Sequence, residues 1–168
     1  GHLNFEGSVT IAEKQDKAIS VALEVDASPT VEKKAPSKIG PIVVTTAGVV
    51  VIDALGSPAL ARRLLAEIAR VTPQKVTHVV VTHYHADHIY GLQVFQDAGA
   101  RIIAHQAGRE YLNSDTARLR LQASRAELAP WIDAQTLRVP ATEWIDGRRE
   151  LTVGDTRLVL QPVGPAHT

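Results

Sequence analysis

The 168-residue sequence contains no cysteine, few aromatic residues and no net charge. Without cysteine there is no disulfide framework, and any bound metal must be held by nitrogen and oxygen atoms. The 18 basic and 18 acidic side chains cancel, so no global positive field attracts the chain to nucleic acid or anionic lipid. No apolar run reaches the roughly 18 residues of a membrane-spanning helix. We therefore expect neither a nucleic-acid partner nor a membrane partner.

What the sequence does contain is enough aliphatic material for a core. Hydrophobic residues make up 45% of the chain and aromatic residues only 4%, so alanine, valine, leucine and isoleucine must fill the interior. This composition argues against disorder, and the length suggests one domain or a large part of one. The N-terminus carries no signal-peptide pattern. A mature secreted chain would lack one too, so the pattern leaves the compartment open.

Residues 1–40 differ in composition from the rest of the chain. Every lysine except Lys75 lies there, whereas every arginine lies at or after Arg62. Alternating apolar and polar residues over 8–14 and 18–26 predict a hairpin, and the proline-rich segment 26–41 predicts a linker. Chance composition and a different origin of this region both fit the asymmetry. We divide the chain into an N-terminal hairpin and linker, 1–40, and a main unit, 41–168.

The main unit predicts strands that alternate with helices. The expected elements are a hairpin over 41–54 that turns near Ala47-Gly48, a helix over 57–72 capped by Ser57, a strand over 75–83, a helix over 87–99, a strand over 101–105, a helix over 115–131 and a hairpin over 149–163. Helix 57–72 has an apolar stripe of Leu60, Leu64, Ile68 and Val71. For helix 115–131 we expect Leu119, Ala123, Ala126 and Leu128 to face the core. This order predicts an α/β fold with a mixed sheet.

The segment THYHADHIYG, residues 82–91, places three histidines beside an aspartate. His83 and His85 share one side of an extended chain, so together they can hold one ion. Asp87 and His88 follow where the chain turns into a helix, which suits a second ion close to the first. Histidine nitrogen and carboxylate oxygen are the ligands expected for zinc where cysteine is absent. Lone histidines such as His78 are more often structural, but this cluster predicts a metal site.

THYHADHIYG resembles the H-x-H-x-D-H signature of the metallo-β-lactamase superfamily. The resemblance extends over 41–168 and includes VVVIDALGSP, VVVTHYHADH and the terminal VGPAHT. It implies the first half of an αββα sandwich, with a mixed sheet covered by helices on one face. The amino-acid sequences of two motifs are most similar to those of zinc hydrolases that accompany quinoprotein dehydrogenases or sulfur-oxidation systems. Membership of that subgroup would favour a periplasmic location.

The resemblance also implies a role for each site residue. His83, His85 and His167 would bind a first zinc, Asp87 and His88 would bind a second, and Asp53 would orient the metal loop through hydrogen bonds. One or two zinc ions are expected, and iron is the less favoured metal. A metal-bound hydroxide would attack an ester, thioester or lactam-like bond of a small-molecule substrate. Asp87 would be the catalytic residue that orients this nucleophile and relays its proton.

The family pattern continues after the position of Thr168 with a bridging aspartate and a last histidine. Without them we expect a weak second metal site and slow hydrolysis. The alternative interpretation is a half-domain that binds metal, or another chain, without turnover. One layer of helices would leave a Val- and Ile-rich sheet face in water, so we expect a homodimer. Tyr90 stands where many members have glycine, and we expect a partly buried aromatic residue under the metal loop.

Overall fold

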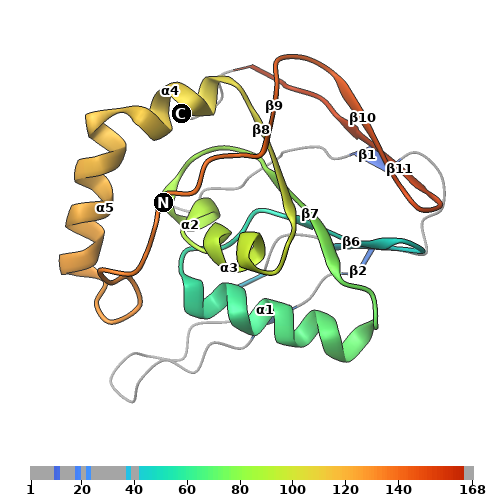
Figure 1. The fold of residues 1–168 in the computed structure, drawn as a ribbon, viewed down its shortest axis with the longest axis horizontal. Coiled ribbons are helices and arrows are strands. Elements are labelled where there is room, and N and C mark those ends of the chain that lie inside the picture. Colours follow the sequence, from blue (N-terminus) through green and yellow to red (C-terminus); the bar gives the residue numbers. More distant parts are fainter. Residues whose placement is uncertain (1–9, 12–17, 20–21, 24–36, 39–41, 165–168) are drawn as a thin grey trace.

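The computed structural model describes residues 10–11, 18–19, 22–23, 37–38 and 42–164. Its centre is a six-stranded sheet with the order β2-β5-β6-β7-β8-β9 (Figure 1). The strands are β2 (Ala18–Ile19), β5 (Ile42–Thr45), β6 (Gly48–Ile52), β7 (Val76–Val81), β8 (Arg101–His105) and β9 (Glu143–Ile145). β5 is antiparallel to β2 and β6, whereas β6, β7, β8 and β9 run parallel. The sheet is therefore mixed, as the sequence predicts.

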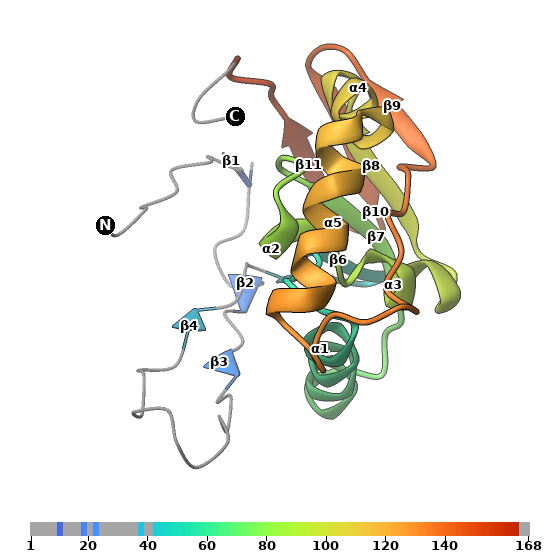
Figure 2. The same ribbon diagram turned by 90° about the vertical axis from the view of Figure 1, so that its left-hand side faces the viewer.

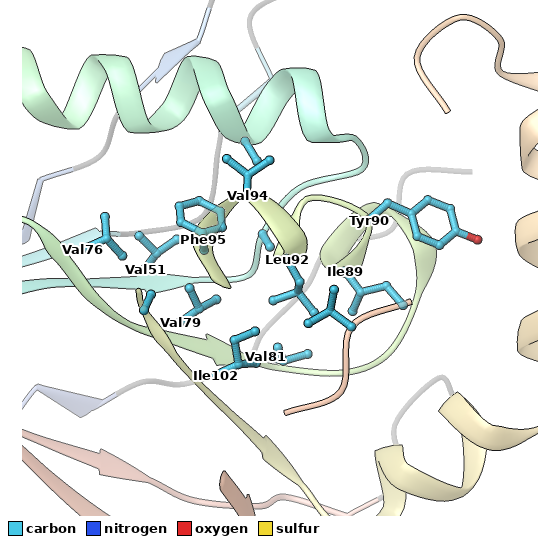
Figure 3. Packing of buried hydrophobic residues seen from close by; sticks show 14 of the residues in the cluster. Val51, Val76, Val79, Val81, Ile89, Tyr90, Leu92, Val94, Phe95 and Ile102 are labelled. Atoms are coloured by element: carbon cyan, nitrogen blue, oxygen red, sulfur yellow. The ribbon is translucent and has the colours of Figure 1, made fainter. Parts of the chain in front are cut away.

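Helices cover one face of this sheet (Figures 1 and 2). They are α1 (Pro58–Val71), α2 (Ala86–Ile89), α3 (Leu92–Asp97), α4 (Ala107–Asn113) and α5 (Asp115–Glu127). Figure 3 shows Val51, Val79 and Ile102 of the sheet packed together with Phe95 of α3, all of them almost fully buried. Parallel strands that are buried on both faces consist of nearly continuous Val and Ile, which explains the apolar runs of β6 and β7.

A small second sheet covers the other face. It contains β1 (Thr10–Ile11), β10 (Arg149–Val153) and β11 (Thr156–Leu160), in the order β1-β11-β10. Val153, Leu158 and Leu160 share a buried cluster with the main-sheet residues Val43, Val50, Ile52, Val80 and Ile103. The turn of this hairpin is tied to the β5–β6 turn, because Thr46 N donates to Asp155 Oδ1 (3.2 Å) and Asp155 N donates to Thr46 Oγ1 (3.1 Å).

The expectation of a sheet face in water is therefore wrong. Val50 is 0% exposed and Val80 is 8% exposed, so both faces of the sheet are buried within one chain. The expected homodimer depended on an exposed sheet face, and the structure removes that reason for it. Self-association itself stays a prediction. The exposed large apolar side chains among the described residues lie elsewhere. Most of them are on or after α5: Leu119, Leu128, Trp131 and Leu137.

Two expectations about the helices need correction. The helix predicted over 87–99 is divided into α2 and α3 because Gly91 N donates to Leu55 O (3.1 Å), and because a Cβ on Gly91 would lie 1.9 Å from Ala54 O. The predicted core face of the helix at 115–131 is also wrong. Leu119 is 53% exposed, and the buried side of α5 carries Ala117, Leu121 and Ser124 instead. In α1 the stripe is right at Leu64 and Ile68 but not at Val71, which is 52% exposed.

Other predicted elements differ in partner or extent. Most of the N-terminal hairpin over 8–26 and of the linker lies outside the described residues. The described strands β1 and β2 pair with β11 and β5, so they are not partners in one hairpin. The described pieces β3 (Ala22–Leu23) and β4 (Ser37–Lys38) pair with each other. Helix α4 and strand β9 were not predicted from the sequence. Within the part of the chain that the structure describes, no helix is long and apolar enough to cross a bilayer.

The covered sheet face leads to a stability prediction. Leu158→Ala removes a fully buried side chain between the two sheets, so we expect the free energy of unfolding to fall by about 2–5 kcal/mol. Leu119→Ala is the matched control, because Leu119 lies on the exposed side of α5, and its effect should stay below about 0.5 kcal/mol. Chemical denaturation of both variants measures the difference. Equal, small losses would mean that β11 does not pack on the main sheet in solution.

Candidate functional site

The candidate site lies at the carboxyl edge of the parallel strands. β6 ends at Ile52 and is followed directly by Asp53, and β7 ends at Val81 and is followed by the segment 82–85 and by α2. β6 and β7 run parallel, so both strand ends reach the same edge of the sheet. In open α/β sheets this edge is where ligands bind. The fold thus brings together two segments that are about thirty residues apart in the sequence.

Asp53 connects these two segments. Its carboxylate accepts hydrogen bonds from Thr82 N and Thr82 Oγ1, both at 2.8 Å, and its Oδ2 lies 2.8 Å from His88 Nδ1. The backbone of Asp53 has a φ of 64°, in the left-handed region that aspartate tolerates better than most residues. Ala54 N also donates to His88 O (2.7 Å). Asp53 thus contacts the segment that carries the histidines, and its role in orienting metal ligands stays a prediction.

The rings of His83, His85 and His88 gather beside this carboxylate. His83 Nε2 lies 3.1 Å from His85 Nδ1, and the centroids of the two rings are 4.7 Å apart with nearly perpendicular planes. The centroids of His83 and His88 are 4.1 Å apart. On its other nitrogen, His83 Nδ1 lies 3.0 Å from Thr82 Oγ1. The sequence-predicted histidines of the loop are thus brought together in the structure.

Asp87 and His88 form a second pair of donors. Asp87 Oδ2 lies 3.2 Å from His88 Nε2, and the Asp87 side chain is 78% exposed, whereas that of His88 is 16% exposed. Burial opposes the charged form of His88, but the hydrogen bond to Asp53 and the negative charges of Asp53 and Asp87 outweigh it. The pKa of His88 is therefore raised above its ordinary value. The charged ring can donate from Nδ1 to Asp53 Oδ2 (2.8 Å) and from Nε2 to Asp87 Oδ2 (3.2 Å).

These donors fit a metal ion in chemistry and in spacing. Two nitrogen ligands at about 2.0–2.1 Å from a tetrahedral zinc are separated by about 3.3–3.4 Å. The distance of 3.1 Å between His83 Nε2 and His85 Nδ1 is close to that edge. Within the described residues, however, no group of three or more His, Asp or Glu side chains is arranged to hold one ion. The donors come in two pairs, and His167, the expected third ligand of the first pair, lies outside the described residues.

Several residues that support the loop were not predicted from the sequence. Thr82 makes the two hydrogen bonds to Asp53 described above. Tyr84 is 5% exposed and its ring stacks on Trp144 of β9, with ring centroids 5.8 Å apart. Burial raises the pKa of Tyr84 to about 12, and the nearby Ala141 backbone offsets this only in part. The available signal for Tyr84 was its place between two histidines in an extended segment, which turns its large aromatic side chain to the opposite side, toward the core.

Tyr90 is buried more deeply than the sequence predicts. It is 3% exposed, and it belongs to the buried cluster on the helix side of the sheet. In Figure 3 its ring lies at the edge of this cluster with the hydroxyl pointing away from it. Tyr90 N donates to Ala86 O (3.2 Å), which ends α2 immediately before Gly91. The tyrosine therefore serves packing at this position.

A comparison with family models decides the family. Residues 42–168 match the model of the metallo-beta-lactamase superfamily. The chain belongs to that superfamily. Members of this superfamily are generally metal-dependent hydrolases and commonly bind zinc. The match contains the whole of the site described above, from Asp53 to His88, and it extends to His167.

Solved structures of metallo-beta-lactamases share the fold. The enzyme from Pontibacter korlensis is 20% identical and matches with a TM-score of 0.58 over 90% of this chain and 59% of its own. The enzyme IND-7 is 19% identical, with a TM-score of 0.60 over 98% of this chain and 64% of its own. A HARLDQ-motif mutant from Cronobacter sakazakii is 17% identical, with a TM-score of 0.55 over 89% and 52%. The present chain thus spans 52 to 64% of the lengths of these three proteins. These likenesses confirm the predicted fold class.

The contacts of Asp53 lead to a prediction for the metal-free protein. Asp53→Ala leaves the largely buried His88 ring without its acceptor, so we expect the free energy of unfolding to fall by about 1–3 kcal/mol. Asp97→Ala, at an exposed position of α3, is the control and should change little. At a pH well above the raised pKa of His88, long-range proton–nitrogen NMR should find the wild-type His88 proton mainly on Nδ1. In Asp53→Ala the proton should shift toward Nε2, which faces Asp87. The same tautomer populations in both proteins would contradict the hydrogen bond.

Proposed function

We propose that this superfamily member binds zinc at the carboxyl edge of its sheet and serves as a hydrolase. The observation that supports it most directly is the pair of ring nitrogens of His83 and His85, 3.1 Å apart, beside the second pair formed by Asp87 and His88. Both pairs lie on one short segment that follows a buried strand. In this proposal His167 completes the first site with His83 and His85, and Asp87 and His88 hold a second ion.

The roles of the chain's own residues follow from their environment. When bound, zinc lowers the pKa of a water molecule to about 7 and polarises the attacked oxygen of the substrate. Asp87 is largely exposed, so its carboxylate can contact a water or a substrate, orient the nucleophile and accept its proton. Asp53 acts one step away: by holding Nδ1 of His88, it leaves Nε2 for a ligand. We propose an ester, thioester or lactam-like bond as the target.

A second candidate function is metal binding without turnover. The observation in its favour is that the described residues supply donors in pairs and include no group of three that could hold one ion. Such a chain would bind zinc and turn over none of these substrates. Two sequence motifs resemble those of the hydrolases that accompany quinoprotein dehydrogenases or sulfur-oxidation systems. This resemblance supports a narrower proposal, that the chain belongs to that subgroup and is located in the periplasm.

Metal analysis tests the site assignment. After dialysis against zinc-free buffer, we expect the protein to retain one equivalent of zinc, or up to two. The double variant His83→Ala with His85→Ala should retain none at the first site, because both of its described ligands are gone. The matched control is His78→Ala with His105→Ala, which removes the same number of histidines outside the cluster and should keep the wild-type content. Equal zinc in both double variants would refute the assignment.

A substitution of Asp87 separates catalysis from zinc binding at the first site. Asp87→Asn keeps the size of the side chain but cannot accept a proton, so we expect hydrolysis to fall by about 10²–10⁴-fold. Zinc bound through His83 and His85 should remain. The assay uses a chromogenic β-lactam, a thioester and an aryl ester in the presence of added zinc, with Asp97→Asn as the control. An unchanged rate would remove Asp87 from the mechanism, and a zinc-loaded wild type inactive on all three substrates would favour the second candidate function.

A further inference from the structure

The segment that carries the first two histidines has no regular secondary structure of its own. It starts where β7 ends, at Val81, and stops where α2 begins, at Ala86. At one end Thr82 N donates to Asp53 Oδ1 (2.8 Å), and at the other end His88 N donates to His85 O (3.0 Å). These contacts fix the ends of the segment. The middle, between His83 and His85, has to be held by side-chain packing.

Tyr84 is the residue in that position. In an extended segment the residue between two neighbours that share a side points to the opposite side. The histidines accordingly face the site, whereas Tyr84 enters the core and is 5% exposed. Its ring is stacked on that of Trp144 with an angle of 22° between the planes. Arg109 covers Trp144 in turn, with its guanidinium carbon 5.1 Å from the ring centroid.

A second contact to the ring comes from Gly108 of α4. A Cβ built on this glycine would lie 2.4 Å from Cδ2 of Tyr84 and 2.6 Å from Cε2. The helix backbone therefore rests directly against the ring, and no side chain fits between them. The Tyr84 hydroxyl adds little to this arrangement, because it is buried without a hydrogen-bond partner among the described residues. The contacts of Tyr84 with Gly108 and Trp144 are made by its planar ring.

We propose that Tyr84 is a positioning residue for the metal site, because its ring, packed against Gly108 and Trp144, fixes the backbone between His83 and His85. The separation of their two ligating nitrogens then depends on α4 and β9, neither of which carries a described ligand. This inference rests on the proposed function, since it concerns the affinity of the His83 and His85 site for its metal. It predicts that contacts on the far side of Tyr84 change metal binding.

The test measures cobalt(II) affinity by competition with a chelator, together with the visible spectrum of bound cobalt. Tyr84→Ala should weaken the affinity by about 10- to 100-fold, the range for residues that orient metal ligands, and should alter the spectrum. Tyr84→Phe keeps the ring and should match the wild type in both. Leu158→Ala controls for lost stability, because it opens a cavity on the opposite face of the sheet, and it should leave affinity and spectrum unchanged.

A second variant approaches the ring from α4 and leaves Tyr84 in place. Gly108→Ala should weaken cobalt binding, because the new methyl group must displace the Tyr84 ring. Alanine is the better helix former, so a loss of affinity cannot come from helix propensity. Gly147→Ala is the matched control, because a Cβ there meets nothing within 4 Å. It should bind cobalt as the wild type does.

The outcomes separate this inference from the proposed function. A wild type that binds no cobalt would overturn both. A wild type that binds cobalt, with Tyr84→Ala and Gly108→Ala equal to it, would overturn the positioning role alone. The same holds if Tyr84→Phe loses as much affinity as Tyr84→Ala, or if Leu158→Ala loses as much as either.

Discussion

The carboxylate of Asp53 is the contact on which the whole site depends. It accepts hydrogen bonds from Thr82 at the end of one strand and lies 2.8 Å from a ring nitrogen of His88 in the following helix. Two parallel strands bring their ends to one edge of a sheet, but that alone leaves the segment between strand and helix undetermined. Asp53 determines it at one end, and its left-handed backbone turns the carboxylate toward both partners. The segment from Thr82 to His88 is thus supported from a neighbouring strand.

Close contacts of two glycine backbones support the same loop from the helix side of the sheet. Gly91 approaches Ala54 O so closely that no Cβ fits, and Gly108 approaches the ring of Tyr84 in the same way. Each glycine lets a helix lie directly against the segment that carries ligands or their support. Among the donors that the structure describes, His83, His85 and His88 are partly buried and Asp87 is exposed. Under the proposed function this packing supports metal binding, because coordination tolerates little change in donor spacing.

The sequence was informative where the pattern is local. The H-x-H-x-D-H spacing, the Ser57 cap and the turn at Gly154-Asp155 each depend on a few neighbouring residues, and the structure has that cap and that turn. The predictions were wrong where contacts between residues distant in the sequence determine the structure. The division of α2 from α3 depends on Ala54 and Leu55, and the buried side of α5 depends on which residues of the core it meets. The burial of the second sheet face could not be inferred either, because it requires a hairpin about a hundred residues away to return to β5.

The contact of Thr46 with Asp155 joins residues 109 positions apart in the sequence. During synthesis on the ribosome, the strands β5, β6 and β7 emerge well before the β10–β11 hairpin that covers them. Their valine-rich face is not covered by β10 and β11 until this hairpin leaves the exit tunnel. Transiently exposed apolar sheet surface is prone to aggregate, and contacts between distant residues form slowly. A pause in translation before the hairpin would therefore prolong the exposure of this face.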